Sequence, residues 1–182
     1  MDIFEPINLE PQPFIQSIMD STPWPDCVKT ATVEQVKEIL FALGWPVDIL
    51  PNMLLCSMPP GWASKIHLDE KHGHDFLSVI NIPVRGRPEL EWFEPLDPLA
   101  PITMYSPIGR DIAQLALEDA RQIATTRGCG LAYLGSSSQW HRVINAGEDW
   151  ASVISIRYIP ESYSDITQDY SRLPWVARLR NK

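Results

Sequence analysis

The sequence has no long hydrophobic run, which limits the places where the chain can work. No apolar stretch approaches the ~18 residues that a membrane-spanning helix needs. The first residues, MDIFEPINLEPQPF, are acidic and interrupted by proline, unlike a signal peptide. We therefore expect a cytoplasmic protein with no membrane partner.

Basic residues and cysteines are also scarce. The 15 lysines and arginines face 23 aspartates and glutamates, which gives a formal net charge of -8. General nucleic-acid binding depends on clustered basic side chains, so we expect no nucleic-acid partner. The three cysteines, Cys27, Cys56 and Cys129, are widely spaced and form no CxxC pair, which favours reduced thiols over a disulfide framework.

The length of 182 residues and the 45% hydrophobic content fit a single globular domain over 1–182. Prolines interrupt the N-terminal segment, 1–52, and leave room for only one well-supported helix. Thr32 and Gln35 form a capping-box pair, and apolar residues follow at helical spacing until Gly44 and Pro46. The segment is therefore predicted to be helical and irregular, with one helix face packed on the rest of the domain.

The character of the sequence changes at residue 53. Short runs rich in β-branched and aromatic residues, bounded by proline and glycine, predict strands over 53–58, 62–69, 76–84, 90–94, 131–134, 139–145 and 152–159. Apolar spacing over 111–126 predicts a helical insert. We expect a mainly β fold with a double-stranded β-helix (jelly-roll, cupin-like) core over 53–160, flanking α-helices, and an irregular tail over 161–182.

One predicted strand carries two candidate metal ligands. In Lys65-Ile66-His67-Leu68-Asp69 the polar residues alternate with apolar ones, so Lys65, His67 and Asp69 share a face. An imidazole and a carboxylate at this spacing can converge on one metal ion. The alternative is the exposed face of an ordinary strand.

A third candidate ligand, His141, lies on the predicted strand over 139–145, which a turn joins to the last strand. In a barrel this late hairpin can return to the strand of His67. Two histidines and one carboxylate on one side, with the opposite positions open, make up the facial triad of non-haem Fe(II) oxygenases. We therefore predict that His67, Asp69 and His141 are both the metal ligands and the catalytic centre, with Fe(II) as the metal.

Four segments in this order, KIHLDEKHGHDFLSVINIPV, LEWFEP, WHRVINAG and SVISIRYIP, resemble the Fe(II)/2-oxoglutarate-dependent oxygenase superfamily. They are most similar to its aspartyl/asparaginyl β-hydroxylase-like branch, over roughly residues 54–160. The resemblance implies a jelly-roll core, Fe(II) on His67, Asp69 and His141, and 2-oxoglutarate as co-substrate. It also implies hydroxylation of an unactivated C–H bond, coupled to oxidative decarboxylation of 2-oxoglutarate to succinate.

The sequence departs from this family where the distal carboxylate of 2-oxoglutarate is normally held. The family has an arginine at the start of the final strand, followed by a serine, whereas this chain has no basic residue there. Arg157 follows two positions after Ser155 and shares its strand face, so these two residues are the predicted 2-oxoglutarate ligands. Lys65 is the second candidate, and a rim salt bridge is the alternative role of Arg157.

The missing arginine leaves other functions open. A cupin-type metal-dependent enzyme without 2-oxoglutarate is one alternative, and a binding module with a vestigial triad is another. His72 and His74 are predicted to lie in a solvated loop, although one of them could line the substrate pocket or replace Asp69. The expected substrate of a hydroxylase is a small molecule or a peptide side chain, but nothing in the sequence identifies it, and the sequence does not reveal the oligomeric state.

Overall fold

The computed structural model describes residues 4–7, 17, 28–44, 47, 50–68, 79–105, 112–127, 132–135 and 139–157. The elements in these ranges are β1 (Phe4–Ile7), β2 (Val28–Thr30), α2 (Val33–Ala42), β3 (Asn52–Met58), β4 (Ile66–His67), β5 (Val79–Arg85), β6 (Pro88–Pro95), β7 (Ile102–Tyr105), β8 (Ile112–Leu115), the 3₁₀ turn η1 (Leu117–Asp119), β9 (Ala120–Thr125), β10 (Ala132–Gly135), β11 (Trp140–Asn145) and β12 (Ala151–Arg157).

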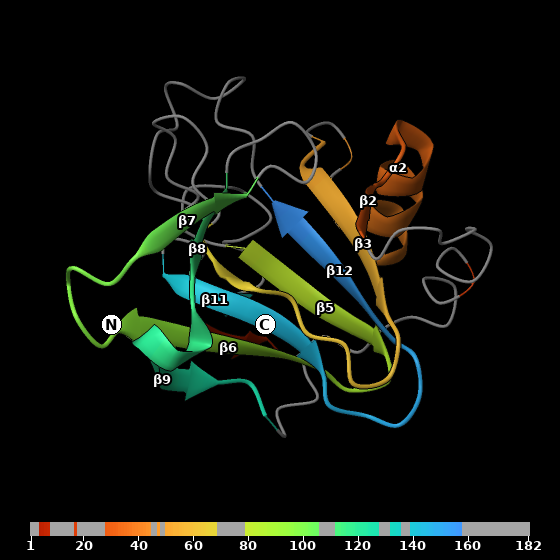
Figure 1. Cartoon of the computed structure of the whole chain (residues 1–182). Helices are drawn as coiled ribbons and strands as arrows, with labels where there is room; N and C mark the ends of the chain where they lie inside the picture. The colour runs from red at the N-terminus through yellow and green to blue at the C-terminus, as the bar shows by residue number, and fades with distance from the viewer. Residues whose placement is uncertain are drawn as a thin grey trace, which may run out of the picture.

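The strands form two antiparallel sheets (Figure 1). The first has the order β1-β10-β5-β12-β3-β2 and the second the order β7-β8-β4-β11-β6-β9. From β3 to β6 the chain alternates between the sheets at every step, and from β9 to β12 it does so again. This interleaving of two four-strand halves is the double-stranded β-helix, so the predicted fold class is confirmed.

Helix α2 begins as the sequence predicts. The Thr32 hydroxyl accepts a hydrogen bond from the Gln35 backbone N–H, and the Gln35 side chain accepts one from the Thr32 N–H. Gly44 follows the helix with a φ of 68°, the left-handed conformation that ends many helices. The buried side chains of α2 are Val36, Ile39 and Leu40.

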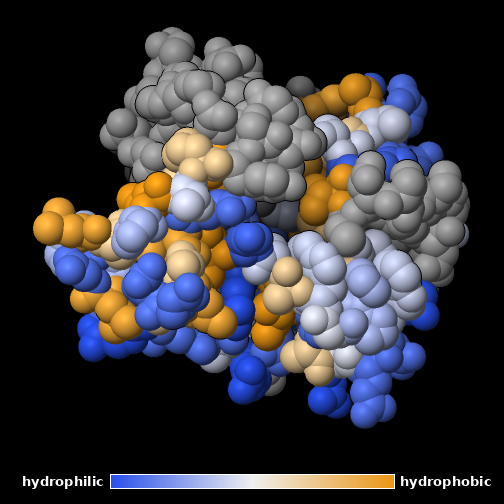
Figure 2. Space-filling model, in the orientation of Figure 1, coloured by the Kyte–Doolittle hydropathy of each residue, from blue (hydrophilic) through white to orange (hydrophobic). Residues whose placement is uncertain are grey.

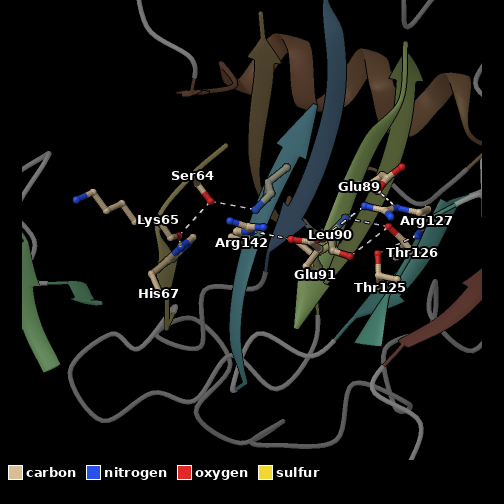
Figure 3. Close-up of polar contacts among 11 residues, drawn as sticks. Ser64, Lys65, His67, Glu89, Leu90, Glu91, Thr125, Thr126, Arg127 and Arg142 are labelled. Atoms are coloured by element: carbon tan, nitrogen blue, oxygen red, sulfur yellow. Dashed lines mark hydrogen bonds and ion pairs between the residues drawn. The ribbon is translucent and has the colours of Figure 1, made fainter. Parts of the chain in front are cut away.

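The first sheet has an outer face that is almost completely buried. Ile80, Ile82, Leu55, Ile154 and Ile156 alternate along β5, β3 and β12 and are each at most 2% exposed. Figures 1 and 3 show α2 on the far side of this sheet from β11, and its buried stripe supplies the apolar partner that this face requires.

The inner face of the first sheet meets the second sheet. Val153 of β12 packs in one cluster with Trp62 and with Val143 of β11. Phe4 of β1 reaches the same interior, where it packs against Leu90 and Trp92 of β6. In this part of the interior, side chains of the two sheets therefore pack against one another.

The second sheet has an outer core of its own. Ile66 of β4, Phe93 of β6, Leu115 of β8 and Trp140 of β11 form one buried cluster on this face. Since the neighbours of these residues along each strand point to the opposite side, this cluster determines which side chains of the second sheet enter the barrel.

The predicted helical insert over 111–126 is wrong. These residues form β8, η1 and β9; β8 pairs with β4 and β7, and β9 pairs with β6. The apolar residues that matched a helix are divided between β8 and β9: Leu115 of β8 is buried, whereas Ile123 of β9 is 38% exposed. Pairing with distant strands overrides the local helical preference of this segment.

The N-terminal segment also contributes strands that the sequence analysis did not predict. β1 pairs with β10 and β2 pairs with β3, so each adds a strand to one edge of the first sheet. The predicted tail over 161–182 lies outside the described residues, and the single-domain organisation stays a prediction. No helix in the described ranges is long and apolar enough to cross a membrane.

The second sheet ends in an apolar strand. β7 is its last strand, and Ile102 and Met104 are 57% and 62% exposed. Leu96 and Leu99 in the preceding loop are also exposed, and Figure 2 shows hydrophobic side chains on this side of the molecule. An exposed apolar edge of this kind is one that native proteins often cover.

The turn between β5 and β6 offers a stability test, because it depends on Gly86. Its φ is 70°, and a Cβ built on it would lie 2.7 Å from the Trp150 carbonyl oxygen. We expect Gly86→Ala to lower the free energy of unfolding by about 3 kcal/mol, through left-handed backbone strain and overpacking. Gly61 is the matched control: its φ is 71°, but nothing lies within 4 Å of the added Cβ, so Gly61→Ala is expected to cost only about 1–2 kcal/mol. Urea unfolding of both variants measures the difference, and equal losses would contradict the close contact at Gly86.

Candidate metal site

Two histidines from distant parts of the chain lie side by side inside the barrel. His67 of β4 is the register partner of His141 of β11, and their ring centres are 4.5 Å apart with an angle of 49° between the ring planes. His141 is 4% exposed and His67 is half-buried. Their strand neighbours Ile66 and Trp140 belong to the outer core of the second sheet, so both imidazoles are directed to the inner face.

The backbone fixes the tautomer of each ring. Nδ1 of His67 lies 2.8 Å from the Lys65 carbonyl oxygen, and Nδ1 of His141 lies 2.8 Å from the Gln139 carbonyl oxygen. A carbonyl oxygen only accepts, so Nδ1 carries a proton in both rings, and in the neutral form of each ring the lone pair lies on Nε2. Metal-bound histidines are commonly oriented in this way, with the second ring nitrogen donating to a carbonyl.

The spacing of the rings also suits a shared ion. With metal–nitrogen bonds of about 2.1 Å, two imidazoles that bind one ion at roughly a right angle have ring centres about 4.5 Å apart. Within the described ranges no group of three or more His, Cys, Asp or Glu side chains gathers around a possible metal position. Asp69, the predicted third ligand, lies outside the described residues, so the structure brings together two members of the predicted triad.

The histidine pair belongs to a longer row across the second sheet. Trp92 pairs with His141, His67 pairs with Gln114, and Gln114 pairs with Thr103. Gln114 is half-buried and lies on the same sheet face as His67, so its amide is a candidate to contact a bound ligand. The sequence analysis missed Gln114 because it placed this residue in a helix.

Apolar side chains make up the wall beside His141. Trp92 is fully buried, and the Phe4 ring stacks on it with ring centres 5.2 Å apart and planes 4° apart. Leu90, Val143 and Ala124 complete the cluster. A ligand bound at the histidines would therefore have an aromatic and aliphatic surface on this side.

The opposite wall contributes a polar pair. Ser155 of β12 and Asn81 of β5 are register partners, 4% and 8% exposed, on the inner face that also carries Val153. β11 and β12 run in opposite directions after a turn, and Val143 packs in one cluster with Val153. His141 lies two residues before Val143 on β11 and Ser155 two residues after Val153 on β12, so the two residues lie at the same level of the barrel. Ser155 was predicted from the sequence, whereas Asn81 was missed.

Two basic residues, Lys65 and Arg157, were predicted as anchors for the distal carboxylate of 2-oxoglutarate. Lys65 is exposed, and in Figure 3 its side chain extends away from His67. Arg157 is the last residue of β12, but its side chain lies outside the described part of the structure, as do His72 and His74. The buried polar residues of the described ranges include no lysine or arginine.

Charged residues gather instead on the outer face of the second sheet, a feature that sequence reasoning missed. Glu91 is 3% exposed and accepts a hydrogen bond from Nε of Arg142 at 2.6 Å. Arg127 pairs with Glu89 and reaches Glu91, as Figure 3 shows. The guanidinium of Arg142 also lies 5.4 Å from the centre of the Phe93 ring. Arg142 therefore points away from His141, as its position one residue further along the strand predicts.

No protein-family model matches the chain, and no curated protein matches it. Structural similarity is weak. Capsular polysaccharide assembling protein CapF from Staphylococcus aureus is 12% identical over 59% of this chain and 24% of its own, with a TM-score of 0.32. Oxalate decarboxylase from Bacillus subtilis is 12% identical over 71% of this chain and 24% of its own, with a TM-score of 0.35.

A recombinant oxalate oxidase in complex with glycolate is 16% identical over 75% of this chain and 52% of its own, with a TM-score of 0.38. This chain thus spans about a quarter to a half of these three proteins. At TM-scores below 0.5 these similarities carry no function over to the chain. The predicted branch of the 2-oxoglutarate-dependent oxygenase superfamily therefore stays a prediction, whereas the jelly-roll fold follows from the strand order itself.

Proposed function

We propose that this chain is a cupin-type metal-dependent enzyme that acts on a small organic molecule inside its barrel. His67 and His141 would hold a divalent ion through Nε2, with Asp69 as the third ligand. The observation that carries the proposal is the paired, inward placement of two imidazoles whose Nδ1 atoms each bond to a carbonyl. Imidazole suits Fe(II) and other divalent transition ions, and such an ion supplies Lewis-acid chemistry and open positions for substrate.

The walls of the barrel limit the substrate class. Trp92 and Val143 offer apolar contact, and Ser155 and Asn81 offer hydrogen bonds from the opposite sheet. No described cationic side chain is buried to neutralise a carboxylate. A divalent ion would itself balance the charge of a group bound to it, so we infer that the part of the substrate beyond the metal is neutral and partly apolar, with one or two hydrogen-bonding groups.

The third ligand can be identified by comparing three single variants. We expect Asp69→Ala to weaken Co(II) binding by roughly 10²-fold or more, because it removes one ligand of the set. His72→Ala and His74→Ala are expected to bind Co(II) as the wild type does. Spectroscopic titration with Co(II) measures all three affinities. Loss of binding in either histidine variant, with Asp69→Ala unaffected, would replace Asp69 by that histidine.

Fe(II)/2-oxoglutarate-dependent hydroxylation is the second candidate. One observation favours it: Ser155, the predicted partner of Arg157 in holding 2-oxoglutarate, is buried on the inner face of β12. If the chain is a cupin-type enzyme that does not use 2-oxoglutarate, titration of 2-oxoglutarate into the Mn(II)-loaded protein should give no heat of binding. Binding that disappears in the Arg157→Ala variant would instead support the hydroxylase and its proposed anchor.

A further inference from the structure

The strand that carries His67 has an irregularity just before this residue. Ala63 forms a bridge with Ile144, and His67 pairs with His141. Residues 64–66 lie between these two points on one strand, whereas only residues 142–143 lie between them on β11. One strand therefore has an extra residue, which defines a β-bulge.

The side chain of Ser64 occupies this bulge. The Ser64 N–H donates to the Val143 carbonyl oxygen at 2.9 Å, in the manner of an ordinary ladder bond. The return bond is different, because the Val143 N–H donates to the Ser64 hydroxyl at 2.9 Å. The hydroxyl thus takes the place of a backbone acceptor at the position where the ladder is interrupted.

The same hydroxyl is connected to the candidate metal site. It donates to the Lys65 carbonyl oxygen at 3.2 Å, and this oxygen is also the acceptor for Nδ1 of His67 (Figure 3). Ser64 therefore contacts both strands of the site: it holds β11 two residues from His141, and it holds the carbonyl that orients His67.

The bulge determines which face His67 occupies. A shift of one residue along a strand moves every following side chain to the other face of the sheet. Without the extra residue, His67 would fall on the outer face with Trp140, and Ile66 would face the barrel. We propose that Ser64 is a positioning residue of the metal site, which fixes the bulge and the ring orientation of His67. This inference rests on the proposed metal-binding function.

The test compares Co(II) affinity in four proteins: the wild type, Ser64→Ala, Ser64→Thr and Thr126→Ala. We expect Ser64→Ala to bind Co(II) about 10–100-fold more weakly, the range found when partners of metal ligands are removed. Ser64→Thr keeps the hydroxyl and is expected to restore most of the affinity. Thr126→Ala is the matched control, because the Thr126 hydroxyl also accepts a backbone N–H, that of Leu90 at 2.9 Å, and has no contact with the histidines. Its Co(II) affinity is expected to equal that of the wild type.

A second readout uses the protein without added metal. The ring nitrogen chemical shifts of His67 report its tautomer, and we expect Ser64→Ala to lower the share protonated at Nδ1, with Thr126→Ala unchanged. Wild-type affinity and tautomer in Ser64→Ala would overturn the inference while leaving the proposed function intact. Equal losses in Ser64→Ala and Thr126→Ala would also overturn it, because the effect would then be general destabilisation. A wild type that binds no Co(II) would reject the proposed function and the inference together.

Discussion

Replacing His141 with alanine is expected to weaken Co(II) binding by about 10²–10³-fold. Structural Zn²⁺ sites with four ligands contribute about 10–16 kcal/mol, which is roughly 2.5–4 kcal/mol for each ligand. His141 is 4% exposed and already held by the Gln139 carbonyl, so no rearrangement of a mobile side chain reduces its contribution. The affinity is measured by titration with Co(II) against a competing chelator.

Ile144→Ala is the control for this variant. Ile144 lies on β11 three residues after His141, and its position in the ladder, opposite Glu89, places it on the outer face of the sheet. We expect this variant to lose stability but to bind Co(II) as the wild type does. If His141→Ala stays folded and keeps its affinity, the metal lies elsewhere.

The second large effect concerns the buried carboxylate on the outer face of the second sheet. We expect Glu91→Ala to lower the free energy of unfolding by about 3 kcal/mol, because it leaves Arg142 without its close partner in a largely buried position. The Arg142 side chain is 22% exposed and the Glu91 side chain 3% exposed. Urea unfolding should show a lower midpoint with an unchanged slope.

Glu94→Ala provides the matched comparison. Glu94 lies on the same strand and pairs with Arg121, but the two side chains are 39% and 67% exposed. Solvent-exposed pairs contribute about 0–1 kcal/mol, so this variant should be nearly as stable as the wild type. Similar losses in the two variants would contradict a special role for the buried pair.

Much of the barrel could be predicted from local pattern. The runs that predicted strands correspond to β3, β5, β6, β10, β11 and β12, and boundaries within the described residues differ by at most two positions, because alternation and turn residues are local signals. The capping box of Thr32 and Gln35 is likewise encoded within one helical turn. His67 was selected because it shares a strand face with Asp69, and His141 because it lies on a late hairpin that can return to the strand of His67.

The errors arose where distant contacts decide the structure. Residues 111–126 were predicted as a helix, yet β8 and β9 exist because β4 and β6 offer them pairing partners. The same error hid Gln114, whose place beside His67 follows only from the ladder. The buried pair of Glu91 and Arg142 was also hidden, since two residues 51 positions apart meet there through β6 and β11.

The alternation of polar and apolar residues assigned His67 to the correct strand face, although a feature outside this pattern decides which face enters the barrel. Alternation within 65–69 assigns His67 and Lys65 to one face, but it does not say which face enters the barrel. The bulge at Ser64 determines this, together with the apolar cluster that retains Ile66 on the outer side. Such a bulge is invisible in sequence, because serine is common in ordinary strands and turns alike.

The resemblance to 2-oxoglutarate-dependent oxygenases implied a jelly-roll core, which the strand order confirms, and a metal site that includes His67 and His141, whose rings the structure places side by side. Its co-substrate has less support, because the described buried polar residues are neutral or acidic apart from His141. The polar pair of Ser155 and Asn81 can bind a neutral group by hydrogen bonds, whereas a carboxylate requires a cation to balance its charge once it leaves water.

The account depends most on the claim that His67 and His141 share one metal ion. Anomalous diffraction from crystals of the Co(II)-loaded protein tests it directly. We predict a single strong peak about 2.0–2.2 Å from Nε2 of both His67 and His141, the distance of a metal–imidazole bond. A peak at any other position, or one bonded to only one of the two rings, would contradict the account.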